Sequence, residues 1–166
     1  KISEKFMYEG KIADTRKPFL PNEKYHFSIS HCDDYAAAIV SKTNRVGVDV
    51  ELISPRIEKI APKFLSKEEH LFFNNQYKLN ANNTVEEQFV NTNSAILNHQ
   101  LLTILWSAKE AVFKWWGNGE VDFSERISSK SFPVNQHGSF ETNFNNTDLP
   151  MSYCIFNKLC LVWVVA

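Results

Sequence analysis

Two short segments of the chain carry side chains that could act together on a phosphate ester. Asp49 and Glu51 lie two residues apart, so on a β-strand both carboxylates point to the same face. Glu110 and Lys114 lie four residues apart, so on a helix they share one face. If this strand and this helix meet, three carboxylates and one ammonium group converge. Such a group suits a divalent cation and a phosphate ester.

Each motif taken alone also has an ordinary interpretation. Asp49 and Glu51 could form a solvent-facing polar edge, and Glu110 with Lys114 could be a surface pair contributing about 0.2–0.5 kcal/mol. The setting of the second pair argues for a cleft, because its segment is apolar on much of its circumference. The apolar residues of this segment are Trp106, Ala108, Val112, Phe113 and Trp115.

A third candidate is the dipeptide Ser30-His31, which follows an expected strand and precedes a turn. A histidine there is commonly structural, although at a strand end it could also donate a hydrogen bond to a phosphate. Ser107 has no His and Asp partners that can be specified, so a hydrolase triad has little support.

The composition favours one globular domain with no nucleic-acid or membrane partner. The chain has 166 residues, 43% of them hydrophobic, and a net charge of −1, which supplies no global basic field for nucleic acid. No apolar run approaches the roughly 20 residues of a membrane span. Three cysteines without zinc-ligand spacing fit reduced thiols, so we expect a cytoplasmic protein. The chain opens at Lys1 rather than Met, and an N-terminal portion could be missing.

The elements that must position these groups predict an α+β domain. The expected strands are Phe27–Ser30, Tyr35–Val40, Val46–Leu52, Ser131–Val134, Ser139–Phe144, Tyr153–Phe156 and Leu159–Val165. Two helices are expected between residues 57 and 74, meeting at Ser66, which has the features of an N-cap. The clearest helix is Leu101–Trp116, ended by Gly117 and Gly119. Residues 74–98 hold eight asparagines and predict a loop or mobile insertion.

Taken together, the motifs resemble those of the 4′-phosphopantetheinyl transferases, specifically of the surfactin-synthetase-activating type. The matching segments are Ser28-Ile29-Ser30-His31, Gly47-Val48-Asp49-Val50-Glu51 and Trp106-Ser107-Ala108-Lys109-Glu110-Ala111-Val112-Phe113-Lys114. The last is similar to the family's W-x-x-K-E-A-x-x-K signature, and all three occur in the family's order. A weaker match is Lys17-Pro18, where Arg16 stands in the place of the family's glycine.

The resemblance implies a particular α+β architecture, in which an antiparallel sheet packs against a long helix. Members of this type resemble a pseudo-dimer of two similar halves with coenzyme A between them. By this comparison, residues 1–45 are the tail of the first half and residues 46–166 are the second half, with the catalytic motifs. A chain with a complete N-terminal half would be monomeric, and without one a homo-oligomer is expected.

The resemblance also implies a reaction: Mg²⁺-dependent transfer of the 4′-phosphopantetheine arm from coenzyme A to a serine of an acyl- or peptidyl-carrier protein, releasing 3′,5′-ADP. Asp49, Glu51 and Glu110 would bind the metal, and Glu110, or a water it orients, would be the base. Lys114 would neutralise charge on the pyrophosphate. The further coenzyme A contacts implied are Lys17, Ser30, His31 and Lys109.

Two alternatives stay open. The chain could be a non-catalytic relative that binds coenzyme A or docks on a carrier protein. It could also be a structural interaction domain, which predicts that Asp49, Glu51 and Glu110 lie far apart.

Overall fold

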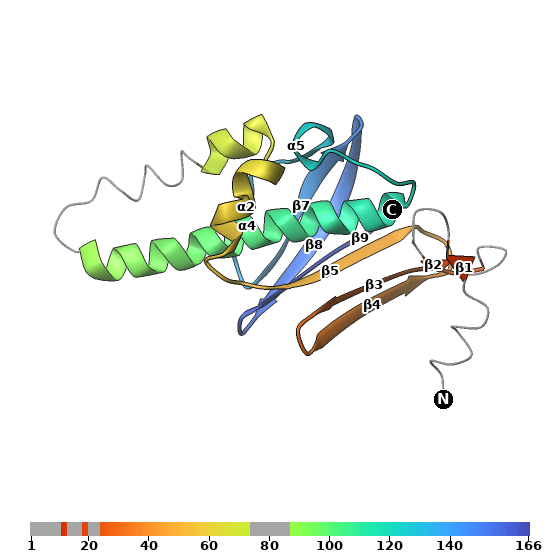
Figure 1. Ribbon diagram of the computed structural model, residues 1–166, viewed down its shortest axis with the longest axis horizontal. Helices are drawn as coiled ribbons and strands as arrows, with labels where there is room; N and C mark the ends of the chain where they lie inside the picture. Colours follow the sequence, from red (N-terminus) through yellow and green to blue (C-terminus); the bar gives the residue numbers. More distant parts are fainter. Residues whose placement is uncertain (1–10, 13–17, 20–23, 74–86) are drawn as a thin grey trace.

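The computed structural model describes residues 11–12, 18–19, 24–73 and 87–166 (Figure 1). Its strands are β1 (Lys11–Ile12), β2 (Pro18–Phe19), β3 (His26–Cys32), β4 (Tyr35–Ser41), β5 (Val46–Leu52), β6 (Ile127–Ser129), β7 (His137–Phe144), β8 (Thr147–Phe156) and β9 (Leu159–Val165). Its helices are α2 (Ile57–Phe64), α4 (Glu87–Trp116) and α5 (Phe123–Arg126), and residues 67–73 are also helical.

The centre of the fold is a five-stranded antiparallel sheet in the order β5-β9-β8-β7-β6. The long helix α4 lies across one face of this sheet, as Figure 1 shows. The apolar core lies between them and includes Leu105, Val112, Met151 and Val162, all with less than 2% of their surface exposed. The predicted α+β class, with an antiparallel sheet packed against a long helix, is confirmed.

Two small sheets stand beside this central one. Strands β3 and β4 form an antiparallel hairpin, joined at Asp33, whose positive φ of 54° suits a tight turn. Strands β1 and β2 pair with each other. The hairpin runs next to β5 (Figure 1), so the segment containing Ser30 lies alongside the segment containing Asp49.

The helices between residues 57 and 73 meet where the sequence predicts. Helix α2 ends at Phe64, and Leu65 has an extended backbone. The next helix begins with a capping box, in which Glu69 N donates to Ser66 Oγ and Ser66 N donates to Glu69 Oε2. Ser66 is therefore confirmed as an N-cap.

The long helix begins much earlier than predicted. Residues 87–98 belong to α4, so the loop expected there is wrong, while residues 74–86 lie outside the described residues. The N-terminal turns of α4 extend beyond the sheet in Figure 1, so they do not need the apolar face whose periodicity signals a helix. At the other end, Gly117 and Gly119 adopt positive φ angles of 70° and 99°, as expected of helix-ending glycines.

One predicted strand, Ser131–Val134, is also wrong. The strand that pairs with β7 is β6, four residues earlier, and the chain then leaves the sheet. Phe132 turns into the core, where its ring stacks on Phe140 at 4.1 Å between centroids. Pro133 has no N–H to donate to a ladder, so apolar character here reflects burial rather than strand pairing.

Strand β8 is longer than predicted, since it begins at Thr147 rather than Tyr153. The missed portion contains Pro150, which argues against a central strand. In the structure, pairing with β9 begins only at Met151, so Pro150 lies where that side of β8 has no paired neighbour. Strands β5 and β9 have the predicted bounds. None of the helices in the described parts of the chain is long and apolar enough to cross a membrane.

Candidate active site

The candidate site forms where α4 crosses β5, and Gly47 makes that crossing close. A Cβ atom on Gly47 would lie 1.9 Å from the backbone oxygen of Ala111, so only glycine allows the helix to approach the strand this far. Asp49 and Glu51 lie on the same face of β5 as Gly47. The close contact therefore places both acids against the helix that carries Glu110 and Lys114.

Asp49 lies at the centre of a three-way contact that joins β3, β5 and α4. Its Oδ1 accepts from Lys114 Nζ at 2.7 Å and from the Ser30 hydroxyl at 2.8 Å. Ser30 Oγ also accepts from Lys114 Nζ at 2.8 Å. Only 3% of Asp49 is exposed, and a buried carboxylate needs such charged and hydrogen-bonding partners.

The other oxygen of the same carboxylate is buried without a hydrogen-bond partner among the described residues. This oxygen is Asp49 Oδ2, whereas Oδ1 accepts from two donors. A buried acceptor that lacks a donor costs stability of the order of 1–3 kcal/mol. Such an atom is suited to a ligand that supplies positive charge.

Glu51 is held from two sides, by an aromatic side chain of α4 and by a thiol of β3. Trp106 Nε1 donates to Glu51 Oε1 at 3.2 Å, and the Cys32 thiol contacts Oε2 at 3.5 Å. Burial raises the pKa of Glu51, and the negative charge of Asp49 raises it further. The charge of Asp49 thus opposes ionisation of Glu51.

Glu110 joins the same electrostatic group from α4. Burial raises its pKa most, the Asp49 charge adds to the rise, and the Lys114 ammonium opposes it. Glu51 contributes a smaller effect in the same direction as Asp49. The charges of Asp49, Lys114 and Glu51 therefore all act on Glu110, while Asp49 and Lys114 are in direct contact. Among the described residues no three acids surround one cation-sized site, so the alternative of a structural interaction domain stays open.

Lys109, expected to contact coenzyme A, lies elsewhere. Its side chain is fully buried, and Nζ pairs with Glu69 Oε2 at 2.8 Å while donating to the backbone oxygens of Phe123 and Ile127. An ammonium has three N–H donors, and these three acceptors use them all. Burial lowers the pKa of Lys109, with Glu69 opposing that effect. As placed, Lys109 ties α4 to its neighbours and has no donor for a phosphate.

The remaining predicted residues fall into two groups. His31 is exposed and, as the next residue along β3, points to the face opposite Ser30. It therefore does not join the contact around Asp49, and its role as a phosphate contact stays a prediction. Lys17 lies outside the described residues.

Sequence reasoning missed part of the site on β3. The alternation at Phe27–Ser30 predicts a half-buried strand, yet the buried side carries the serines: Ser28 is 4% exposed and Ile29 is 55% exposed. Ser28 Oγ accepts from Val48 N at 3.1 Å, and Ser30 contacts Asp49. Cys32 continues the same face toward Glu51. The signal was the i, i+2, i+4 spacing of these three small polar residues.

The donor set fits a hard divalent cation without forming a closed cage. Across the described parts of the chain, no three His, Cys, Asp or Glu side chains are positioned to ligate one ion. Magnesium, however, usually takes one or two carboxylates and completes its shell with water and substrate phosphate oxygens. Buried Asp49 Oδ2 and the nearby acids suit this mode, and the metal roles of Asp49, Glu51 and Glu110 stay predictions.

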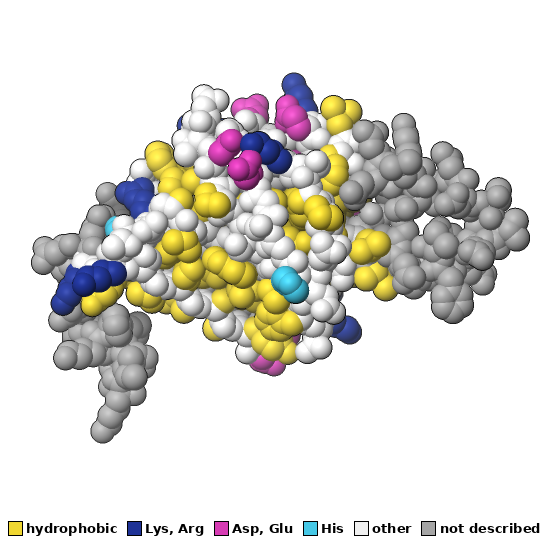
Figure 2. All heavy atoms as spheres, turned by 180° about the vertical axis from the view of Figure 1, so that it is seen from behind, with side chains coloured by type: hydrophobic (Ala, Val, Ile, Leu, Met, Phe, Trp, Pro, Cys, Tyr) yellow, Lys and Arg dark blue, Asp and Glu magenta, His cyan; other side chains and the backbone are white. Residues whose placement is uncertain are grey.

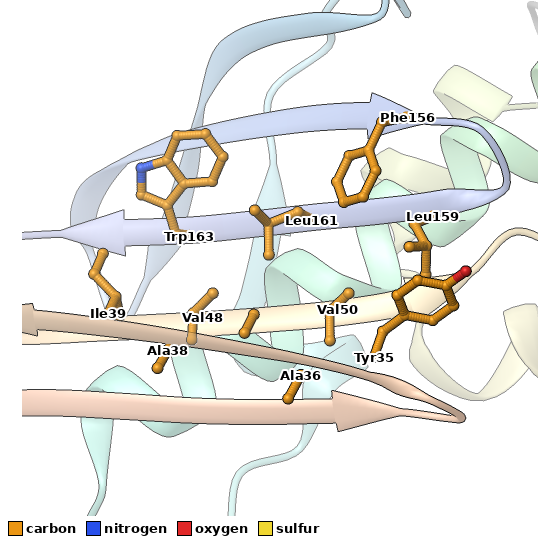
Figure 3. Close-up of a pocket in the computed structure, with 11 residues that line it drawn as sticks. Tyr35, Ala36, Ala38, Ile39, Val48, Val50, Phe156, Leu159, Leu161 and Trp163 are labelled. Carbon is orange, nitrogen blue, oxygen red and sulfur yellow. The ribbon is translucent and has the colours of Figure 1, made fainter. Parts of the chain in front are cut away.

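A second hollow lies on the opposite face of the sheet, between the β3–β4 hairpin and strands β5, β8 and β9 (Figure 3). Its volume is about 440 Å³. Apolar side chains line it, including Val48, Val50, Leu161 and Trp163. Figure 2 shows hydrophobic side chains in a band across the face turned away from α4. The lining holds no Asp, Glu, His, Lys or Arg, so the hollow lacks the charged groups that bind a metal or a phosphate.

Comparison with known proteins agrees with the geometry. The family model described as the 4′-phosphopantetheinyl transferase superfamily matches residues 45–162, which include β5, α4 and the first part of β9. No curated protein matches the chain.

Proposed function

Since the chain belongs to the 4′-phosphopantetheinyl transferase superfamily, we propose that it modifies an acyl- or peptidyl-carrier protein. Membership of the family supports phosphopantetheine transfer in general. Our proposal adds that coenzyme A donates the arm to a carrier serine, that Mg²⁺ is required and that 3′,5′-ADP leaves. It also adds that the chain is of the surfactin-synthetase-activating type.

The observation that carries the proposal is the contact of Lys114 with Asp49 where α4 crosses β5, at a site whose charges also act on Glu110. In the proposed reaction, Asp49 and Glu110, with Glu51 beside them, hold Mg²⁺. When bound, the ion would offset negative charge on the pyrophosphate of coenzyme A. Lys114 adds a second positive charge next to the same group, and preorganised charge of this kind stabilises phosphoryl transfer.

Glu110 is the proposed acceptor of the serine proton, directly or through a water that it orients. A bound Mg²⁺ would lower the proton affinity of Glu110, which favours the route through a water that Glu110 orients. The deprotonated serine oxygen then forms a bond to the β-phosphorus of coenzyme A, and the bond to the 3′,5′-ADP oxygen breaks. Ser30 holds Asp49 and Lys114 in position for this step.

The division of the chain belongs to the proposal as well. We assign residues 46–166 to a half that carries the catalytic motifs and residues 1–45 to the tail of a first half. The mass of the protein in solution tests this division. A complete site between two halves requires either one longer chain or an assembly of several chains.

Intact-mass spectrometry tests the proposed activity. The protein is incubated with coenzyme A, Mg²⁺ and an apo-carrier protein, and we expect the carrier to gain the mass of one phosphopantetheine arm. Omission of Mg²⁺ or addition of a chelator should abolish the gain, and a carrier with serine replaced by alanine is the matched control. Calorimetric binding of coenzyme A with no mass gain would favour the non-catalytic relative and reject the transferase.

A further inference from the structure

The ammonium group of Lys114 occupies the place beside Asp49 where positive charge is needed. We propose that Lys114 is an exchangeable counter-ion: it holds Asp49 while no divalent cation is bound, and moves from Asp49 to the substrate's pyrophosphate when a cation binds. This inference rests on the proposed function, because it concerns the same metal site.

The first step of the argument is that Asp49 cannot stand alone. Its carboxylate is almost fully buried, and the energetic penalty for a buried unpaired charge is large. Lys114 Nζ lies 2.7 Å from Oδ1, and Ser30 bridges the two groups. These contacts give the carboxylate its compensating charge in the absence of a metal.

The second step is that the Lys114 ammonium can move away from the Asp49 carboxylate. The Lys114 side chain keeps 25% of its surface exposed, compared with 4% for Asp49. A lysine has a flexible four-carbon stem and an ammonium that water solvates well, so it can swing toward a nearby anion. Lys109, whose side chain is fully buried and bonded to two backbone carbonyls, has no such freedom.

The third step is that a divalent cation and the Lys114 ammonium repel each other when both contact the Asp49 carboxylate. Two positive charges a few ångströms apart repel strongly in a partly buried site. Asp49 Oδ2 is the acceptor still without a partner among the described residues, so a cation there would lie next to the ammonium on Oδ1. Movement of Lys114 to a pyrophosphate relieves this repulsion and delivers its charge to the reacting group.

Calorimetric titration with Mn²⁺ alone tests the exchange, using wild type, Lys114→Met and Lys130→Met. Lys130 is an exposed lysine paired with Glu141 and Asp148 away from the site, so it controls for loss of one positive charge. We expect Lys114→Met to bind Mn²⁺ about tenfold more tightly than wild type, because it no longer competes for Asp49. Lys130→Met should bind as wild type does.

A crystal structure of the wild type with Mn²⁺ and coenzyme A, whose pyrophosphate is intact, gives a second readout that does not depend on the variant. We expect Lys114 Nζ to lie beyond hydrogen-bond distance of Asp49 Oδ1 and to contact the phosphate. If Mn²⁺ binds and Lys114 stays on Asp49, the inference is overturned and the proposed metal site stands. If neither wild type nor Lys114→Met binds Mn²⁺, both the inference and the metal-dependent function fail.

Discussion

Helix α4 carries two lysines five residues apart, and they have opposite situations. Lys109 is fully buried and forms an ion pair with Glu69, which is also fully buried. Lys114 pairs with Asp49 at a similar distance, yet a quarter of its side chain is exposed and Glu110 lies close by. Both belong to one sequence motif, so the motif alone does not separate a structural lysine from a candidate catalytic one.

The difference lies in the kind of acceptor that holds each ammonium and in the elements from which these acceptors come. Lys109 ties α4 to the helix that contains Glu69, to Phe123 in α5 and to Ile127 in β6. Two of these acceptors are backbone carbonyls, which have no freedom to leave. Lys114 instead contacts two side-chain oxygens at the edge of the site. Lys109 therefore fixes α4 to its neighbours, and Lys114 places a positive charge in the candidate site.

The largest effect should come from Lys109→Met. Glu69 would remain buried with an uncompensated charge, which we expect to lower the free energy of unfolding by about 3–5 kcal/mol. Chemical denaturation measures the loss. Adding Glu69→Gln should recover part of it, because the neutral amide no longer needs a cation. A Lys109→Met protein as stable as wild type would contradict the structural role.

Next in size is the effect of Asp49→Asn on turnover. Loss of the carboxylate removes the partner of Lys114 and a proposed metal ligand, so we expect kcat/KM to fall by about 10²–10³-fold. Initial rates of carrier modification, followed by intact mass, measure it. Asp148→Asn, at an exposed aspartate paired with Lys130, is the matched control and should keep the wild-type rate. Equal rates in both variants would remove Asp49 from the site.

A smaller effect on stability is expected from Gly47→Ala. The added methyl would collide with the backbone oxygen of Ala111, and the helix must move away from β5. We expect a loss of about 1–3 kcal/mol, as for other overpacked contacts, together with slower turnover. Thermal unfolding and the same mass assay provide the two numbers. Wild-type turnover in this variant would show that the site tolerates a wider crossing of α4 and β5.

The smallest effect should come from Lys130→Met, because its ion pairs with Glu141 and Asp148 are exposed. Asn143, and then Lys130, lowers the pKa of Asp148. A group with a lowered pKa stabilises the fold above its unfolded-state pKa and loses that contribution as the pH falls through its folded value. Any difference between variant and wild type should therefore begin to shrink as the pH falls to about 4 and vanish below the lowered folded-state pKa of Asp148. Unfolding curves at several pH values check this.

The sequence was most informative where side-chain pattern and backbone pairing agree. Strands β5 and β9 were predicted with their observed bounds, because both are rich in β-branched and apolar residues. The prediction failed where burial and pairing diverge. Phe132 is apolar because it fills the core, and residues 87–98 are helical although their sequence has no clear apolar periodicity.

The site shows the same limit. Spacing within β5 and within α4 indicated which charged residues share a face, and the structure places these residues in one electrostatic environment, with Asp49 in contact with Lys114. The family resemblance implied a coenzyme A contact for Lys109, and spacing could not correct this because it does not tell how deep a position lies. Nor does it reveal which side of β3 is buried. Only the neighbouring polar groups of β5 explain why the serines turn inward.

Those serines also form the junction between the β3–β4 hairpin and the central sheet. Among the described residues, β3 and β5 belong to different sheets, and hydroxyl groups join them where backbone ladders join the other strands. Parting the hairpin from the sheet would break a few side-chain bonds and no backbone ladder between them. Asp49 has partners on both sides of this junction, since Ser30 lies on β3 of the hairpin and Lys114 lies on α4, which packs on the central sheet. Separation of the hairpin from the sheet would therefore break the hydrogen bond that Ser30 donates to the Asp49 carboxylate.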